Sequence, residues 1–122
     1  MIAHRARRSA VCRQEGGYWT IVYDGTLFRV RDAKGLRYLA HLLLHPGERV
    51  QCDALVSAAG GTSAAATSRE RTRVAVTKRI KAALAKIATL HLPFAQHLTT
   101  RIRTGYVCVY VGDADRHVSW QS

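Results

Sequence analysis

Few residues of this 122-residue chain have the type and spacing that metal or acid–base chemistry needs. His41 and His45 stand four apart, a spacing that places two imidazoles on one side of a helix, within reach of one metal ion. No glutamate lies between them, as the zinc-protease pattern requires. A second polar cluster near the end of the chain consists of Asp113, Asp115 and His117. We interpret the histidines as helix-end residues and the cluster as a solvated loop, and we expect no metal and no cofactor.

Other catalytic patterns are missing from the sequence. The stretch Gly60-Gly61-Thr62-Ser63 lacks the lysine and the spacing of a phosphate-binding loop, and no G-x-S-x-G nucleophile motif occurs. Cys12, Cys52 and Cys108 are an odd number of widely spaced cysteines without a C-x-x-C pair, which indicates reduced structural thiols in a reducing compartment. We therefore expect a protein that is not an enzyme.

The charge balance is the strongest functional signal. The chain has 19 Lys and Arg against 8 Asp and Glu, a formal charge of +11, while 48% hydrophobic residues and two prolines are typical of a single globular domain. Such a balance predicts attraction to polyanions, with nucleic acid first and an anionic membrane surface second. The sequence has neither an apolar run long enough to span a membrane nor a signal peptide, so we expect a cytoplasmic protein without a membrane partner.

The first part of the chain predicts an arm and a hairpin. Residues 1–17 carry several arginines and end in Gly16-Gly17, which indicates a flexible basic arm. Its Arg5, Arg7 and Arg8 are interpreted as a disordered tail, with a minor-groove arm as the alternative. Residues 18–23 and 26–31 are strand-like runs around Asp24-Gly25, the signal for a type I′ turn. The alternation puts four residues on the buried face, Trp19, Ile21, Phe28 and Val30, and turns three to water, Thr20, Arg29 and Arg31.

Two helices are predicted next. Asp32 is a good N-cap for a core helix that ends at His45-Pro46-Gly47. Its apolar residues at helical spacing are Leu36, Leu39, Ala40 and Leu43. After a brief extended stretch, residues 48–52, Asp53 is the predicted N-cap of a short second helix that Gly60-Gly61 ends.

Residues 69–90 predict a long amphipathic helix. Its apolar face consists of Val76, Ile80, Ala83, Leu84 and Ile87. Seven cations between Arg69 and Lys86 oppose the single acid Glu70, so this helix alone carries a net charge of +6. We expect these cations to form one basic side.

The last part of the chain predicts a second hairpin. Leu92-Pro93-Phe94 is expected to break the long helix, with a short linking turn up to Leu98. Residues 99–104 and 106–111 are strand-like, with Gly105 between them, and residues 112–122 remain an unassigned tail. The predicted fold is α+β: a domain over residues 18–111 with an N-terminal β-hairpin, a three-helix core and a C-terminal β-hairpin.

Three stretches stand in an order and at a spacing that are found in a known DNA-binding domain. They are residues 36–50 (LRYLAHLLLHPGERV), residues 71–84 (RTRVAVTKRIKAAL) and residues 100–106 (TRIRTGY). They resemble the first helix, the recognition helix and the wing of the winged helix-turn-helix domain of OmpR/PhoB-type bacterial transcription regulators. The chain departs from that pattern at Arg73, where the family usually has a buried aliphatic residue, and at Arg103, where it often has a glycine.

The resemblance implies sequence-specific binding of double-stranded DNA and transcription regulation, with the recognition helix in the major groove and the wing on adjacent backbone or minor groove. Cations bind guanine edges and phosphates, and small alanines allow close approach. Arg101 and Arg103, two apart on a predicted strand, are expected to point to the same side. The predicted DNA contacts are Arg71, Arg73, Ala75, Thr77, Lys78, Arg79, Lys81, Ala82, Lys86, Arg101 and Arg103.

Alternatives of another class remain open at this point. The same fold could be a protein-interaction module that docks an acidic protein partner or RNA polymerase through its basic helix. An RNA-binding domain is a weaker alternative, because Tyr106 and Tyr110 share a face but no aromatic stripe suited to base stacking lies among the cations. A DNA-binding form could act as a homodimer on repeated half-sites.

Overall fold

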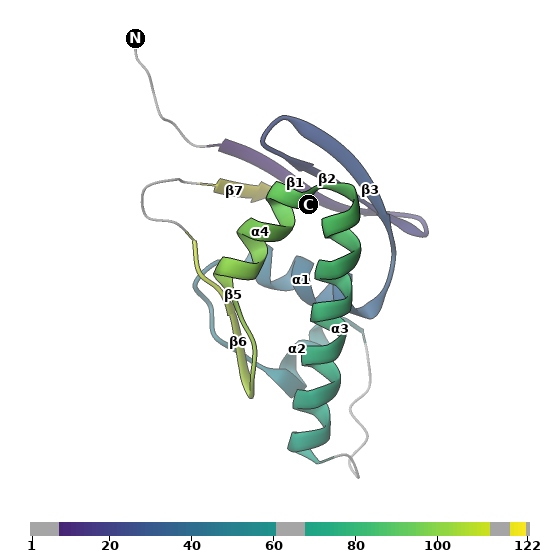
Figure 1. Ribbon diagram of the computed structural model, residues 1–122. Helices are drawn as coiled ribbons and strands as arrows, with labels where there is room; N and C mark the ends of the chain where they lie inside the picture. The colour runs from purple at the N-terminus through teal and green to yellow at the C-terminus, as the bar shows by residue number, and fades with distance from the viewer. Residues whose placement is uncertain (1–7, 61–67, 113–117, 122) are drawn as a thin grey trace.

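Two sheets and four helices make up residues 8–60, 68–112 and 118–121, the part of the chain that the computed structural model describes (Figure 1). The strands are β1 (Arg8–Glu15), β2 (Tyr18–Tyr23), β3 (Thr26–Arg31), β4 (Val50–Gln51), β5 (Ile102–Arg103), β6 (Val107–Tyr110) and β7 (Val118–Gln121). The helices are α1 (Lys34–Leu44), α2 (Cys52–Ala58), α3 (Arg69–Leu90) and α4 (Leu92–Arg101). The expected α+β class is confirmed.

The N-terminal sheet has the strand order β3-β2-β1-β7. The predicted β2–β3 hairpin is confirmed, and its turn has the type I′ signature because φ is 52° at Asp24 and 81° at Gly25. All four residues predicted for its inner face are buried. Thr20 does not face water as predicted: it is only 8% exposed, and its hydroxyl donates a hydrogen bond to the Glu15 carboxylate of β1.

The prediction of a flexible arm over residues 1–17 is wrong for residues 8–17. Residues 8–15 form β1, which pairs antiparallel with β2 from Val11↔Val22 to Glu15↔Tyr18. Gly16, with φ 63°, and Gly17 make the turn between the two strands. Cys12 is buried and its neighbours Val11 and Arg13 are half-buried and exposed, so β1 has one buried face and one solvent-facing side. The arginines of this segment led to the prediction of a flexible arm instead of a strand. Residues 1–7, including Arg5 and Arg7, lie outside the described part.

The edge strand of this sheet beyond β1 is β7, which pairs with β1 in parallel from Arg8↔Val118 to Val11↔Gln121. The sheet is therefore mixed and joins both ends of the chain. The domain boundaries predicted at residues 18 and 111 are too narrow, because strands outside both limits belong to this sheet.

Helix α1 ends where predicted, before His45-Pro46-Gly47, but starts one residue later than predicted. Ala33 is the N-cap, without a side-chain cap bond. The predicted cap, Asp32, instead accepts a 2.8 Å hydrogen bond from the Trp19 indole N–H and pairs with Arg37 at 2.7 Å. The expected core residues of α1 are all buried. Asp53 is likewise not an N-cap, because α2 begins one residue earlier, at Cys52.

Helix α3 has the predicted bounds, and the Ser68 side chain caps it by accepting a hydrogen bond from the Arg71 backbone N–H at 3.2 Å. Its predicted apolar face is confirmed, with Val76, Ile80, Ala83 and Ile87 buried. Leu84 is half-buried. This stripe packs into one continuous core with the apolar sides of α1, α4 and β2.

The linking turn predicted for residues 92–98 is wrong, because these residues belong to helix α4 and the described core has four helices, not three. A proline in the first turn of a helix loses no intrahelical bond, so Pro93 is compatible with a helix that starts there. The His91 ring Nδ1 caps α4 by accepting the Phe94 N–H at 3.2 Å. Phe94, Ala95 and Leu98 are buried.

The second sheet has the order β4-β6-β5 and contains the predicted C-terminal hairpin in shortened form. β6 pairs with β5 at Ile102↔Tyr110 and with β4 at Val50↔Cys108. Residues 99–101, predicted as strand, form the last turn of α4. The β5–β6 hairpin lies beside the first half of α3, and its tip points toward the N-terminus of that helix (Figure 1).

Candidate nucleic-acid interface

Most cations of α3 lie on the side that faces away from the core. Successive residues of a helix are rotated by about 100°. This rotation sets Arg71, Lys78 and Lys81 on the side opposite the buried residues of α3, and Arg79 and Lys86 on one flank. All are exposed, and none has an ion-pair partner among the described residues. The group, termed here the basic side of α3, consists of Arg71, Lys78, Arg79, Lys81 and Lys86.

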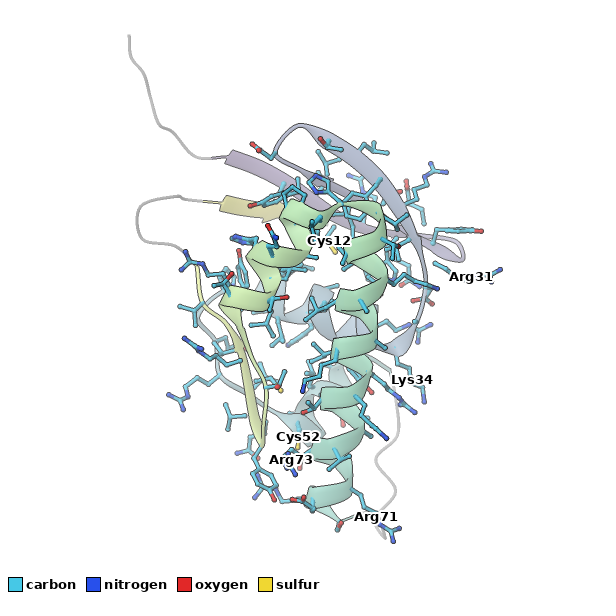
Figure 2. All side chains as sticks on the ribbon, in the orientation of Figure 1. Cys12, Arg31, Lys34, Cys52, Arg71 and Arg73 are labelled. Atoms are coloured by element: carbon cyan, nitrogen blue, oxygen red, sulfur yellow. The ribbon has the colours of Figure 1, made fainter. Side chains whose placement is uncertain are left out.

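The other two cations of α3 face the β5–β6 hairpin, so the expectation of a single basic side that holds all seven is wrong. Arg69 and Arg73 each place the guanidinium carbon 5.3 Å from the centre of the Tyr106 ring. Arg73 also pairs with Glu70 at 2.5 Å. Figure 2 shows Arg71 and Arg73 on opposite sides of the first turns of α3, with Arg73 toward the hairpin.

Glu70 completes this contact between α3 and the hairpin tip. Its carboxylate accepts a hydrogen bond from the Tyr106 hydroxyl as well as those from Arg73. The hydrogen bonds from Arg73 and then Tyr106 lower the pKa of Glu70 below its usual value. The one acid of α3 is therefore ionised and paired with Arg73, in the first turn of the helix at the hairpin tip.

The small residues of α3 that were predicted to face DNA differ from one another in exposure. Ala82 is exposed and Ala75 is half-buried, and both lie among the cations of the basic side. Thr77 is half-buried, and its hydroxyl oxygen is enclosed by protein. The Thr77 hydroxyl therefore does not reach the surface at which a base edge would lie.

The two arginines predicted for one strand face do not share a strand. Arg101 is half-buried in the last turn of α4, and its carbonyl oxygen accepts the Val111 N–H at 2.8 Å. Arg103 is exposed on β5. The prediction that both arginines point to the same side of one strand is wrong, because α4 extends to Arg101. Arg103 is the one of the two that is exposed on the hairpin.

Two cations outside α3 extend its basic side, and the sequence-based prediction did not include them. Arg31 at the end of β3 and Lys34 at the start of α1 are exposed, without an ion-pair partner among the described residues. Figure 2 shows both along the same margin of α3 as Arg71. Gly35 fixes this arrangement, because a Cβ on it would lie 2.1 Å from the carbonyl oxygen of Arg79. A glycine within a predicted helix was the available signal of such a close approach.

Other candidate sites contribute little chemistry. The rings of His41 and His45 stack at 4.3 Å, and burial, then the neighbouring His45, lowers the pKa of His41. Within residues 8–60, 68–112 and 118–121, no three His, Cys, Asp or Glu side chains are grouped to hold a metal ion. The cluster of residues 113, 115 and 117 and the stretch 61–63 lie outside the described part.

The cysteines are buried inside the protein. All three are free thiols, as predicted for structural cysteines. Burial raises the pKa of Cys12 to about 12 and raises the pKa of Cys108 as well. Because the thiolate is the reactive form, these side chains are poor nucleophiles.

Comparison with known proteins gives no match: no family model, no curated protein and no solved structure matches the chain. Among the described helices, none combines the length and the apolar character needed to cross a membrane.

Proposed function

We propose that this protein is a bacterial transcription regulator that binds double-stranded DNA through the basic side of α3. The observation that carries the proposal is that five exposed cations lie along the outer side and one flank of one helix, while the only acid of that helix is paired with Arg73 and Tyr106 at its N-terminal end. Such a surface attracts phosphates without local competition from carboxylates.

The dimensions of α3 suit the major groove of DNA. An α-helix with its side chains is about 10–12 Å wide, and the major groove of B-DNA is about 12 Å wide. In the proposed complex, Lys78 and Arg79 in the middle of the helix approach guanine edges or phosphates, and Ala82 allows the close approach that this requires. Because α3 has its core stripe on the other side, it can enter the groove without losing contact with the core.

The flanks of α3 would then contact the DNA backbone. Figure 2 shows Arg31 and Lys34 on one margin of the helix, and Arg103 belongs to the β5–β6 hairpin, which Figure 1 shows on the other side of α3. In the proposed winged helix-turn-helix arrangement, α2 and α3 form the helix pair and this hairpin is the wing. Helix α4 is an added element between the recognition helix and the wing, which the OmpR/PhoB pattern does not include.

Binding at repeated half-sites would make the active form a homodimer or a tandem pair in the cytoplasm. One copy presents one α3, which reads only a short stretch of DNA. Fragments selected from random duplex DNA test this part of the proposal, because a repeat in the enriched sequence reveals two bound copies.

Anisotropy titration of a labelled duplex with matched variants tests the proposed interface. Lys78→Ala and Arg79→Ala should each lower the affinity about 5-fold to 150-fold if the side chain contacts a base. Arg13→Ala is the control, because it removes the same charge from the outer face of the N-terminal sheet. Unchanged affinity in both α3 variants, or an equal loss in the control, would overturn the proposal and favour the protein-interaction alternative.

A further inference from the structure

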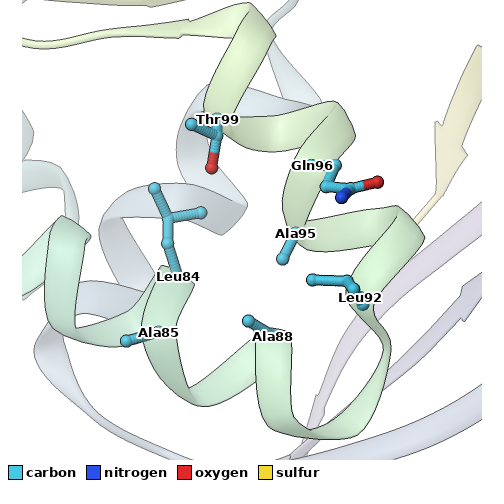
Figure 3. A pocket seen from close by; sticks show the side chains of 7 residues that line it. All are labelled: Leu84, Ala85, Ala88, Leu92, Ala95, Gln96 and Thr99. Carbon is cyan, nitrogen blue, oxygen red and sulfur yellow. The ribbon is translucent and has the colours of Figure 1, made fainter.

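A shallow apolar groove runs between α3 and α4, next to the basic side of α3. It encloses about 330 Å³. Leu84, Ala85 and Ala88 line it from α3, and Leu92 and Ala95 line it from α4. Figure 3 shows Ala88, Leu92 and Ala95 directed toward the same space. We term this feature the α3–α4 groove.

The core does not account for the apolar residues of this groove. α3 and α4 already bury Ile80, Ile87, Phe94 and Leu98 on their inner sides. On the outer side, Leu92 is 54% exposed, and Ala85 is exposed at a helix position where a charged residue is usual. The outer side of the helix pair therefore carries apolar side chains that the core leaves in contact with solvent.

The shape of the groove fits a helix. Leu84 and Ala88 are four residues apart on α3, and Leu92, Gln96 and Thr99 follow at intervals of four and three on α4. These spacings form one ridge on each helix, and the small alanines beside them allow a third helix to approach closely. Gln96 and Thr99 add hydrogen-bonding groups to an otherwise apolar lining.

The positive charges beside the groove favour a partner with acidic side chains. Lys81 is exposed three and four residues before Leu84 and Ala85, so its ammonium group lies at one end of the groove, with Lys78 one turn away. α4 has no acidic residue, and α3 has none after Glu70. A second copy of a chain with a net charge of +11 would bring cations against these lysines.

We propose that the α3–α4 groove binds an amphipathic helix of a partner protein whose apolar stripe is flanked by acidic residues. The stripe would fill the space between Leu84 and Leu92, and the carboxylates would pair with Lys81 and Lys78. Lys78 and Lys81 also belong to the basic side of α3, so the partner helix and DNA would compete for these two lysines. The groove lining itself contains none of the residues proposed to contact DNA, so DNA binding is not a premise of this inference.

A designed peptide tests this inference on the full chain. The probe is a fluorescein-labelled amphipathic peptide with leucines at intervals of three and four and glutamates on both flanks, compared with the same peptide carrying lysines on the flanks. We expect the acidic peptide to bind at least tenfold more tightly, and its NMR shift changes to lie on the groove residues of α3 and α4.

Leu92→Ser should weaken binding of the acidic peptide at least fivefold. Its matched control is Leu27→Ser, which changes an exposed leucine of β3 and should leave the affinity unchanged. Leu92→Ser should also leave duplex DNA affinity unchanged, which separates this inference from the proposed function. The inference is overturned if the lysine peptide binds equally well, if Leu92→Ser binds normally, or if sedimentation shows that the groove instead joins two copies of the chain.

Discussion

Gly35 packs directly against the backbone of Arg79, so closely that a Cβ on Gly35 would lie 2.1 Å from the Arg79 carbonyl oxygen and 3.0 Å from the Ala83 Cβ. This contact joins the start of α1 to the middle of α3. It therefore holds Lys34 beside the basic side of α3.

Gly35→Ala should destabilise the protein. Alanine is favoured over glycine in a helix by about 1 kcal/mol, but the clash is with backbone, and overpacking of this kind costs about 1–3 kcal/mol. We expect a lower free energy of unfolding in urea denaturation. Gly17→Ala is the control, because nothing lies within 4 Å of the Cβ it would add. Equal stability of Gly35→Ala and the wild type would contradict this packing.

Asp32 should make stability depend on pH in the acid range. The hydrogen bond from Arg37 is the main cause that lowers the pKa of Asp32 below its ordinary 3.8, and the Trp19 hydrogen bond acts in the same direction. A carboxylate with a lowered pKa stabilises the fold above its unfolded pKa, and this stability is lost as pH falls through the folded pKa.

Asp32→Asn should therefore lower the free energy of unfolding by about 1–2 kcal/mol at pH 7, with a difference from the wild type that shrinks steadily below pH 3.8. Glu48→Gln is the control for the loss of one surface carboxylate. A difference that stays constant down to low pH would show that the ionised Asp32 is not the stabilising form.

Lys34 and Arg31 should contribute phosphate contacts without sequence preference. Lys34→Ala and Arg31→Ala are each expected to weaken binding to all duplexes by a similar factor, and to reduce the slope of log affinity against log salt by about 1. The measurement compares an enriched duplex with a scrambled one in both variants. A loss confined to the enriched duplex would mean that these residues read bases.

Tyr106 should hold the β5–β6 hairpin against α3. Tyr106→Ala removes the ring between Arg69 and Arg73 and the hydroxyl bonded to Glu70, whereas Tyr106→Phe removes the hydroxyl alone. We expect amide exchange at the hairpin residues Arg103 and Val109 to become several-fold faster in the alanine variant and to change less in the phenylalanine variant. Identical exchange in all three proteins would show that the tip contact does not order the hairpin.

Local signals predicted the elements that depend on neighbouring residues. Asp24-Gly25 fixed the β2–β3 turn because type I′ geometry needs two positive φ angles, and the spacing of Val76, Ile80, Ala83 and Ile87 was sufficient for the bounds of α3. Pro93 led to the wrong prediction of a linking turn in place of α4, because a proline is compatible both with the end of a helix and with its first turn.

Features that depend on distant partners were not predictable in this way. β7 pairs with β1 across most of the chain, and the tail sequence does not reveal this pairing. Asp32 binds Trp19 rather than capping α1 because β2 brings the indole to it. The contact between Arg73 and Tyr106, far along the chain, is likewise not visible in the sequence. The division of the α3 cations between two sides was predictable, because a rotation of about 100° per residue sets Arg73 about 160° around the helix from Arg71.

The salt dependence of duplex DNA binding by the wild-type protein tests the central claim most directly. If the basic side of α3 and its flanks neutralise about four to seven phosphates, log affinity should fall against log salt concentration with a slope of about −4 to −6. An affinity that does not change with salt, or no measurable binding at low salt, would contradict it.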